Sequence, residues 1–184
     1  MNKIVKLAIV LFLVCAITAG ILGAVYVITE EKIAYQNELK KTNAYAAVLP
    51  SDSYETVTSY DSAAIQEQYK VKITAVSSCD DGYVVESSFS GAQGTITMAC
   101  GVSKDYKCTG ISIISHSETS GLGANAASTA EVGVNFRAQF VGQGSDIALS
   151  KNGGSIDALT GATITSKSVT NAAAASIAVV KSLG

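Results

Sequence analysis

Charge and aromatic side chains are sparse in this chain. Of its 184 residues only 15% are charged, proline occurs once and tryptophan is absent. The sequence has no block of Lys or Arg residues, which argues against a nucleic-acid-binding protein. A chain of 184 residues is long enough to bury a real core, and its low charge argues against a disordered tail.

Several motifs for redox and nucleotide sites are also missing. The four cysteines form no CxxC pair and no His/Cys cluster, so we expect no zinc site and no ordinary iron–sulfur site. A glycine fingerprint for NAD(P) and a P-loop are absent as well, so the chain alone is not expected to take a hydride from NADH. Cys100 and Cys108 flank a predicted hairpin, where a disulfide and two buried free thiols are both open.

One long apolar run lies near the N-terminus. Residues Leu7–Ile28 carry no charge, and as a helix they would span roughly 33 Å, slightly more than the hydrocarbon core of a bilayer. A cleaved signal peptide is the alternative, but the run is long for one and no clean cleavage site follows. We expect an uncleaved anchor within residues 1–28, with Lys3 and Lys6 keeping the N-terminus cytoplasmic and the rest outside the plasma membrane.

The rest of the chain divides into a predicted stalk, residues 29–53, and a domain, residues 54–184. Helical spacing marks Glu30–Lys41, and the segment Tyr54–Tyr69 is ambiguous. Runs rich in β-branched residues predict an antiparallel meander of four strands. These are Val71–Val76, Gly82–Phe89, Gly94–Ala99 and Thr109–Ser115.

Loops and helices follow the predicted strands. His116–Ala130 and Gly142–Ser155 are loops rich in small residues, and between them Val132–Gln139 is helical or extended. Ser166–Leu183 is Ala-rich and places its apolar residues near one face, which predicts an amphipathic helix. Without regular βαβ alternation, the fold class is α+β: an antiparallel sheet flanked by helices.

The segment before the last helix carries the strongest chemical signal. Thr163, Thr165 and Ser166 are N-cap candidates, and a helix start offers N–H groups and partial positive charge to a phosphate. Gly161 and Ala162 keep side-chain bulk away from the backbone. From the residues alone this is a weak phosphate site, and a capped helix after a tight turn is the favoured alternative.

The sequence Asp157-Ala-Leu-Thr-Gly-Ala-Thr-Ile-Thr165 resembles the flavinylation motif of a known family. This is the FMN-binding domain shared by the G subunit of Rnf complexes and the C subunit of Na⁺-translocating NADH:quinone reductases. His116–Gly123 is similar to that family's H-x-E-T-P-G-L-G loop, although Ser120 replaces the proline. Other similar features are Gly82-Tyr83, Gly94-Thr95-Ile96, Gly110-Ile111, Gln139-Phe140 and the single N-terminal span.

The resemblance implies a role for each matching residue. Thr163 would hold FMN through a phosphoester, and a separate flavin transferase would recognise Asp157, Thr160, Gly161 and Ala162. Thr165 and Ser166 would act as donors to the phosphate. His116 is expected to be a structural loop residue. The isoalloxazine ring would be lined by Glu118, Thr119, Gly121, Leu122 and Gly123.

The function implied by the resemblance is electron transfer within a membrane-bound Rnf complex. The chain would be a carrier without catalytic residues of its own, relaying electrons between ferredoxin and NAD⁺ sites on other membrane subunits. That flow would be coupled to Na⁺ or H⁺ translocation. Three alternatives stay open: a quinone-reductase C subunit, a stand-alone membrane-anchored FMN carrier, and a non-redox surface-anchored domain.

Overall fold

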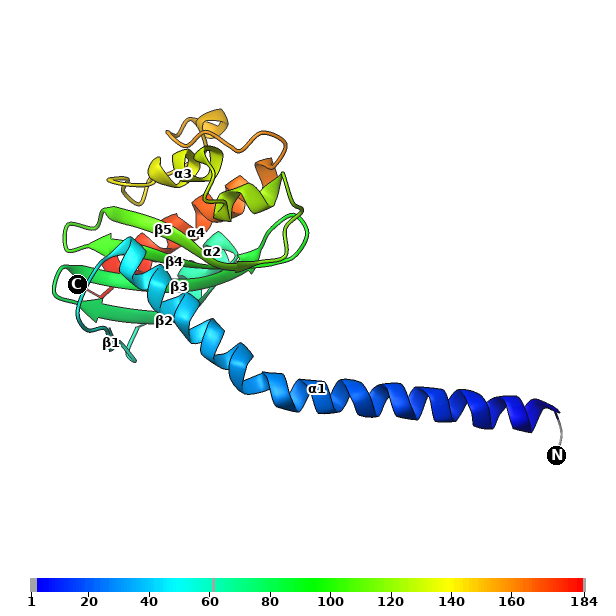
Figure 1. The fold of residues 1–184 in the computed structure, drawn as a ribbon. Coiled ribbons are helices and arrows are strands. Elements are labelled where there is room, and N and C mark those ends of the chain that lie inside the picture. Colours follow the sequence, from blue (N-terminus) through cyan, green and yellow to red (C-terminus); the bar gives the residue numbers. More distant parts are fainter. Residues whose placement is uncertain (1–2, 61, 184) are drawn as a thin grey trace. The chain divides into compact units, whose positions relative to one another are not determined.

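The computed structural model describes residues 3–60 and 62–183, which form two compact units divided between Lys40 and Lys41. The fold is α+β, with one long N-terminal helix followed by a five-stranded sheet and further helices (Figure 1). Its elements are α1 (Lys3–Val48), β1 (Glu55–Thr56), α2 (Ala63–Tyr69), β2 (Val71–Cys79), β3 (Gly82–Ser90), β4 (Thr95–Ser103), β5 (Cys108–His116), η1 (Gly123–Ala127), α3 (Glu131–Ala138), η2 (Ser150–Asn152) and α4 (Thr163–Lys181).

The first part of α1 is apolar and exposed along its length. It is the one helix among the described residues that is long and apolar enough to cross a membrane. The hydroxyls of Thr18 and Thr29 donate to the carbonyls of Val14 and Val25, at 3.0 and 2.8 Å, so these polar groups are satisfied within the helix. Such a helix fits a lipid environment, where each polar group needs a partner of its own.

The last turns of α1 belong to the folded domain. Ala44, Tyr45 and Val48 are buried and pack with Val84 and Ala99 of the sheet. The structure thus divides the chain near residue 40, whereas a stalk reaching residue 53 was expected. The physical reason is an apolar stripe at helical spacing, which turns this segment of the helix toward the sheet.

The sheet is antiparallel, and its strands lie in sequence order from β1 to β5. All four predicted strands are present, but β2 continues to Cys79 and β4 to Ser103, beyond the expected ends. The ambiguous segment 54–69 supplies β1 and α2. Tyr106, in the turn between β4 and β5, has a left-handed backbone with φ of 58°.

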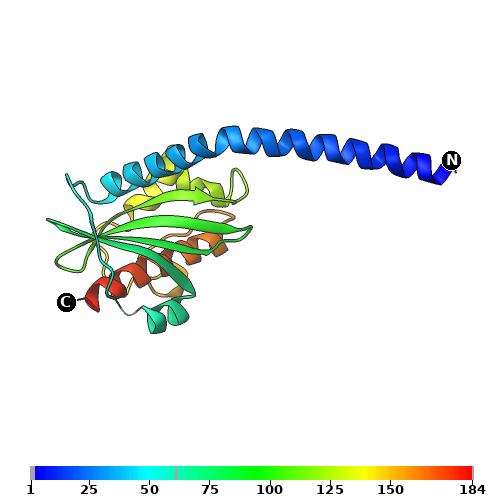
Figure 2. The ribbon, with the colours of Figure 1, turned by 90° about the horizontal axis from the view of Figure 1, so that it is seen from below.

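Helices cover both faces of the sheet. Figure 2 shows α4 beneath the strands and the last turns of α1 above them. The core between α4 and the sheet contains Val85, Met98, Val169 and Ala173, all inaccessible to solvent. Because the alanines of α4 have small side chains, the helix can pack close to the strands. Its apolar face is buried against the sheet, as predicted from the sequence.

Two predicted helices differ from the structure in detail. The segment 132–139 is helical rather than extended as far as Ala138, within α3, and Gln139 is the C-cap of that helix. Helix α4 begins at Thr163, before the expected Ser166, and its N-cap is Ala162. The prediction that Thr163, Thr165 or Ser166 caps this helix is therefore wrong, since all three lie within it.

Cys100 and Cys108 face each other beneath α4. Their Sγ atoms are 3.8 Å apart, and both are buried free thiols. Of the two states left open by the sequence, the structure has the reduced pair. The hydrogen bond with Cys108, together with burial, raises the pKa of the Cys100 thiol well above its ordinary value, which keeps that thiol protonated.

Candidate functional site

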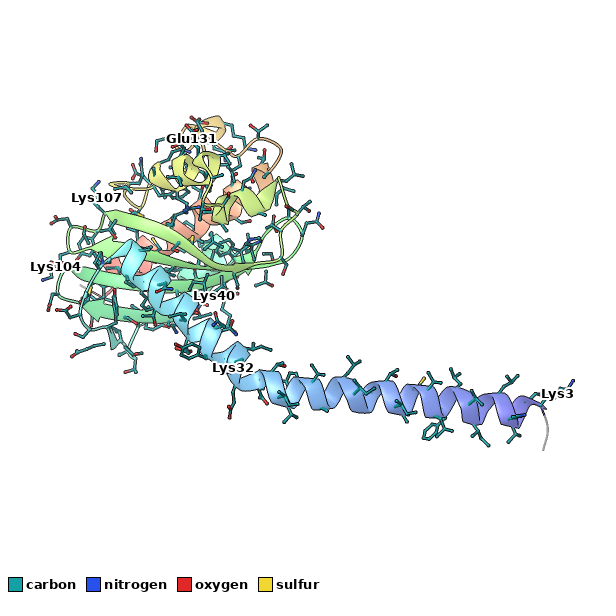
Figure 3. All side chains as sticks on the ribbon, viewed as in Figure 1. Lys3, Lys32, Lys40, Lys104, Lys107 and Glu131 are labelled. Carbon is teal, nitrogen blue, oxygen red and sulfur yellow. The ribbon has the colours of Figure 1, made fainter. Side chains whose placement is uncertain are left out.

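Three segments meet at one end of the sheet. The first turn of α4, the turn between β3 and β4, and the loop after β5 lie together there (Figure 1). The turn between β4 and β5, marked by Lys104 and Lys107 in Figure 3, lies at the opposite end. The fold thus brings the loop after β5 next to the start of α4, although the sequence separates them. Both of these segments carry predicted site residues.

The carboxylate of Glu118 joins these three segments. One oxygen accepts a hydrogen bond from the hydroxyl of Thr165 in α4, and the other accepts from the N–H of Gln93 at 2.9 Å. A side chain at Gly91 or Gly123 would overlap this carboxylate, so both positions need glycine. Glu118 is only 9% exposed, and its carboxylate accepts hydrogen bonds from within the protein.

The pKa of Glu118 reflects two opposing effects. Burial alone raises it, because a charged carboxylate loses solvation. Hydrogen bonds from the Thr165 hydroxyl and from the backbone N–H groups of Ala92, Gln93 and Gly94 lower it, and together they hold the pKa below its ordinary value. Glu118 is therefore an anion at neutral pH.

Thr163 occupies the exposed start of α4. It is the first residue of a 19-residue helix, and the N-cap Ala162 has no side chain that can accept a hydrogen bond from the first turn. Ile164 beside it is 64% exposed. The hydroxyl of Thr163 thus stands at a helix N-terminus whose N–H groups and partial positive charge face outward.

Leu122 brings the other loop against this helix start. The backbone of Gly161 has φ of 73°, and a Cβ there would lie 3.0 Å from Cδ2 of Leu122. Leu122 is 44% exposed, as an apolar side chain beside the turn. The two predicted site loops are therefore in contact immediately before Thr163.

Thr165 and Ser166 direct their hydroxyls inward. Both residues are fully buried; the Thr165 hydroxyl donates to Glu118, and the Ser166 hydroxyl donates to the carbonyl of Ala162 at 2.9 Å. Ser166 Oγ also accepts from the N–H of Leu159 at 2.9 Å. A phosphate at this end would therefore meet main-chain N–H groups of the first turn, rather than these hydroxyls.

The remaining predicted residues lie on the surface around the site. Thr119, Gly121, Asp157 and Thr160 are exposed. The carbonyl of Thr119 accepts from the N–H groups of Leu122 and Ala124, both at 3.2 Å, which closes the turn that carries Leu122. His116 is also exposed, and its Nδ1 accepts from the N–H of Glu118 at 3.3 Å.

Two residues that hold the site were given no role by the sequence. The guanidinium of Arg137, the chain's single arginine, donates to the carbonyls of Ala126 and Ser128, at 2.7 and 2.9 Å. Gln139 bonds the main chain of Asp157. The sequence does show a single arginine and a Gln139-Phe140 pair similar to that of the family. It does not show which main-chain groups these side chains bind, because only the fold brings those groups together.

These residues fit the two chemical parts of FMN. The uncapped start of α4 suits a phosphate, because main-chain N–H groups and the helix dipole both favour an anion there. The exposed side chains of Leu122 and Ile164 offer apolar surface for a flat ring. The site therefore offers a surface suited to an anionic group next to a surface suited to an aromatic group.

Comparisons with known proteins show which family the chain resembles over most of its length. A family model described as FMN-binding domain matches residues 91–178, and one described as RnfG N-terminal region matches residues 1–48. The G subunit of the ion-translocating oxidoreductase complex of Methanosarcina acetivorans is 34% identical over 176 residues, covering 93% of this chain and 91% of that protein.

Two further relatives bear more specific names. The G subunit of the proton-translocating ferredoxin:NAD⁺ oxidoreductase complex of Clostridium ljungdahlii is 35% identical, covering 92% of this chain and 87% of that protein. The G subunit of the Na⁺-translocating ferredoxin:NAD⁺ oxidoreductase complex of Acetobacterium woodii is 33% identical, covering 97% and 92%. The similarity therefore extends over nearly the whole chain.

Proposed function

Because the chain belongs to the G-subunit family of ion-translocating ferredoxin:NAD⁺ oxidoreductase complexes, we propose that it is an electron carrier with FMN joined to Thr163. It would relay electrons between ferredoxin and NAD⁺ sites on other membrane subunits. The names of its relatives include both a proton-translocating and a Na⁺-translocating complex, so the proposal covers coupling to either ion.

The observation that carries this proposal is the exposed hydroxyl of Thr163 at the uncapped start of α4. A phosphoester there keeps one negative charge, which the helix terminus stabilises by roughly 0.3–1 kcal/mol. A threonine hydroxyl is a poor nucleophile unaided, so a separate flavin transferase would make the bond. The exposed residues Asp157, Thr160 and Gly161 lie in the motif that such an enzyme would read.

The remaining site residues would hold and shield the cofactor. When bound, FMN supplies the capacity to take up and release single electrons, and the protein tunes it by contact and exposure. Leu122 would pack on the ring, and the glycines beside it would let main-chain N–H groups approach. Glu118 would keep its loop against α4 through Thr165.

The apolar part of α1 supports a single membrane anchor, through residues 7–28. With Lys3 and Lys6 on the cytoplasmic side, the domain would lie outside the cytoplasm. A covalent bond then prevents loss of FMN by dilution. If donor and acceptor are both cytoplasmic, electrons would cross the bilayer twice, which gives electron flow a route to couple with ion movement.

The deciding experiment is the intact mass of the native chain. We expect an increase of one FMN less one water, and a flavin absorption that survives denaturation. Thr163→Ala removes the hydroxyl and should abolish both, whereas Thr58→Ala, which removes the hydroxyl of an exposed threonine outside the motif, should leave both unchanged. An unmodified peptide spanning residue 163 from the native organism would refute the proposal.

Two further measurements separate the remaining alternatives. Copurification with the other subunits distinguishes a complex subunit from a stand-alone carrier. Protease treatment tests the orientation: sealed cells should lose the domain, and inverted vesicles should protect it. The reverse pattern would contradict an exported domain.

A further inference from the structure

The side chain of Gln139 holds the main chain of Asp157 at two points. The N–H of Asp157 donates to Oε1 of Gln139 at 2.7 Å, and Nε2 of Gln139 donates to the carbonyl of Asp157 at 3.3 Å. The amide thus pairs with one residue as a neighbouring strand would. We call this pair of bonds the Gln139 clamp.

The clamp is itself fixed to the core. Gln139 follows α3 directly, and the next residue, Phe140, is fully buried. The rings of Phe136 and Phe140 pack edge to face, with centroids 5.3 Å apart. Nε2 of Gln143 also donates to the carbonyl of Gln139 at 3.1 Å. The position of the clamp is therefore set by buried packing rather than by the loop it holds.

A second side chain holds the other end of the same loop. Ser166 accepts from the N–H of Leu159 and donates to the carbonyl of Ala162. The exposed loop that leads to α4 is thus held at its entry by Gln139 and at its exit by Ser166. Side chains from two separate elements keep one short surface segment in a single conformation.

Contacts of the Asp157 carboxylate within the described residues do not explain why the main chain of Asp157 is held at two points. Asp157 is exposed, and within the described residues its carboxylate oxygens take part in no hydrogen bond or ion pair. Its main chain is fixed while its charged group faces solvent. The bonds to Gln139 fix the main-chain position from which this carboxylate extends, which lowers the entropy cost of binding a partner outside the chain.

We propose that Gln139 is a positioning residue that presents the Asp157 carboxylate to the enzyme attaching FMN to Thr163. This inference rests on the proposed function. In the attachment, a bond forms between Thr163 Oγ and phosphorus, the P–O–P bond of a flavin dinucleotide donor breaks, AMP leaves and the hydroxyl proton is released. Without the clamp only a fraction of chains presents Asp157 correctly, so KM rises by the inverse of that fraction while kcat is retained.

The test follows FMN attachment to the full chain in detergent, purified from cells without a transferase. Initial rates are measured with a purified flavin transferase and FAD over a range of chain concentrations. We expect Gln139→Ala to raise KM by roughly 10- to 100-fold, with kcat within about twofold. Gln68→Ala, which removes an exposed amide from α2, is the matched control and should leave both constants unchanged.

A double-mutant cycle separates positioning from general stability. In an Asp157→Ala background, Gln139→Ala should change kcat/KM by less than about twofold, because the group it presents is already gone. Gln139→Glu keeps the acceptor for the Asp157 N–H but loses the donor to its carbonyl, so its KM should lie between those of wild type and Gln139→Ala. It also replaces Gln139→Ala if that variant does not fold.

The opposite results are equally clear. A wild-type KM in both Gln139 variants overturns the inference, as does an equal loss with and without the Asp157 side chain. In either case the wild-type chain still gains FMN and the proposed function stands. If the wild-type chain gains no FMN, the proposed function fails and this inference falls with it.

Discussion

The carboxylate of Glu118 accepts a hydrogen bond from the hydroxyl of Thr165, although 47 residues separate them in the chain. This contact joins the loop after β5 to the first turn of α4, two residues beyond Thr163. It is buried, and glycines at positions 91 and 123 make room for it. The geometry of the proposed flavin site therefore depends on a carboxylate beneath the surface.

Replacing Glu118 by Gln should destabilise the domain in a pH-dependent way. The variant loses a charged acceptor and places an NH₂ group among donors, which costs about 1–3 kcal/mol of unfolding free energy at pH 7. The folded-state pKa of Glu118 lies below its ordinary value. Its contribution to stability is thus present above the unfolded-state pKa of about 4.3 and is lost as pH falls through the folded-state pKa.

Denaturant unfolding of wild type and Glu118→Gln at pH 7 and near pH 3 measures this effect. The difference between the two proteins should be large at pH 7 and should shrink at the lower pH. Glu67→Gln, on the exposed side of α2, is the control and should change stability by less than about 0.5 kcal/mol. Equal stability of Glu118→Gln and wild type at pH 7 would contradict the buried contact.

A side chain at Gly101 should loosen the end of α1 from the sheet. A Cβ there would lie 2.6 Å from the carbonyl oxygen of Val48, which also accepts a hydrogen bond from the hydroxyl of Thr109. Gly101→Ala should therefore lower the unfolding free energy by about 1–3 kcal/mol, the usual cost of overpacking.

Gly110 provides the matched control, because it pairs with Gly101 across β4 and β5. A Cβ at Gly110 would lie 3.6 Å from Cα of Val48, an ordinary contact distance. Gly110→Ala should therefore be tolerated. Chemical denaturation of both variants tests the pair. If Gly101→Ala and Gly110→Ala lost similar amounts of unfolding free energy, the close contact between Val48 and Gly101 would be contradicted.

The buried cysteine pair should resist alkylation in the folded protein. Cys100 and Cys108 are buried beneath α4, and the pKa of Cys100 is raised by its bond with Cys108 and by burial. Cys79 is partly exposed. In a pulse of alkylating reagent followed by peptide mass analysis, Cys79 should react before Cys100 and Cys108. Labelling of Cys100 at the rate of Cys79 would show that the packing of α4 over the sheet is open.

The main helices and strands of this protein could be predicted from its sequence alone. The charge-free run, the strands of the meander and the Ala-rich last helix each have a pattern of apolar residues that repeats within a few positions. Such patterns act through the nearest neighbours in one helix or strand, so they can be recognised without knowing the fold. The motif near Thr163 was recognised in the same way, from a short run of adjacent residues.

The tertiary structure decided which of these segments meet. Thr165 and Ser166, expected to contact a phosphate through their hydroxyls, are turned inward because Glu118 and the loop before α4 supply closer partners. The Gln139 clamp spans 18 residues and the Gln139 side chain carries no mark of its partner in the sequence. Long-range hydrogen bonds of this kind arise only when packing of the core brings distant main chain within reach, and no periodic pattern encodes them.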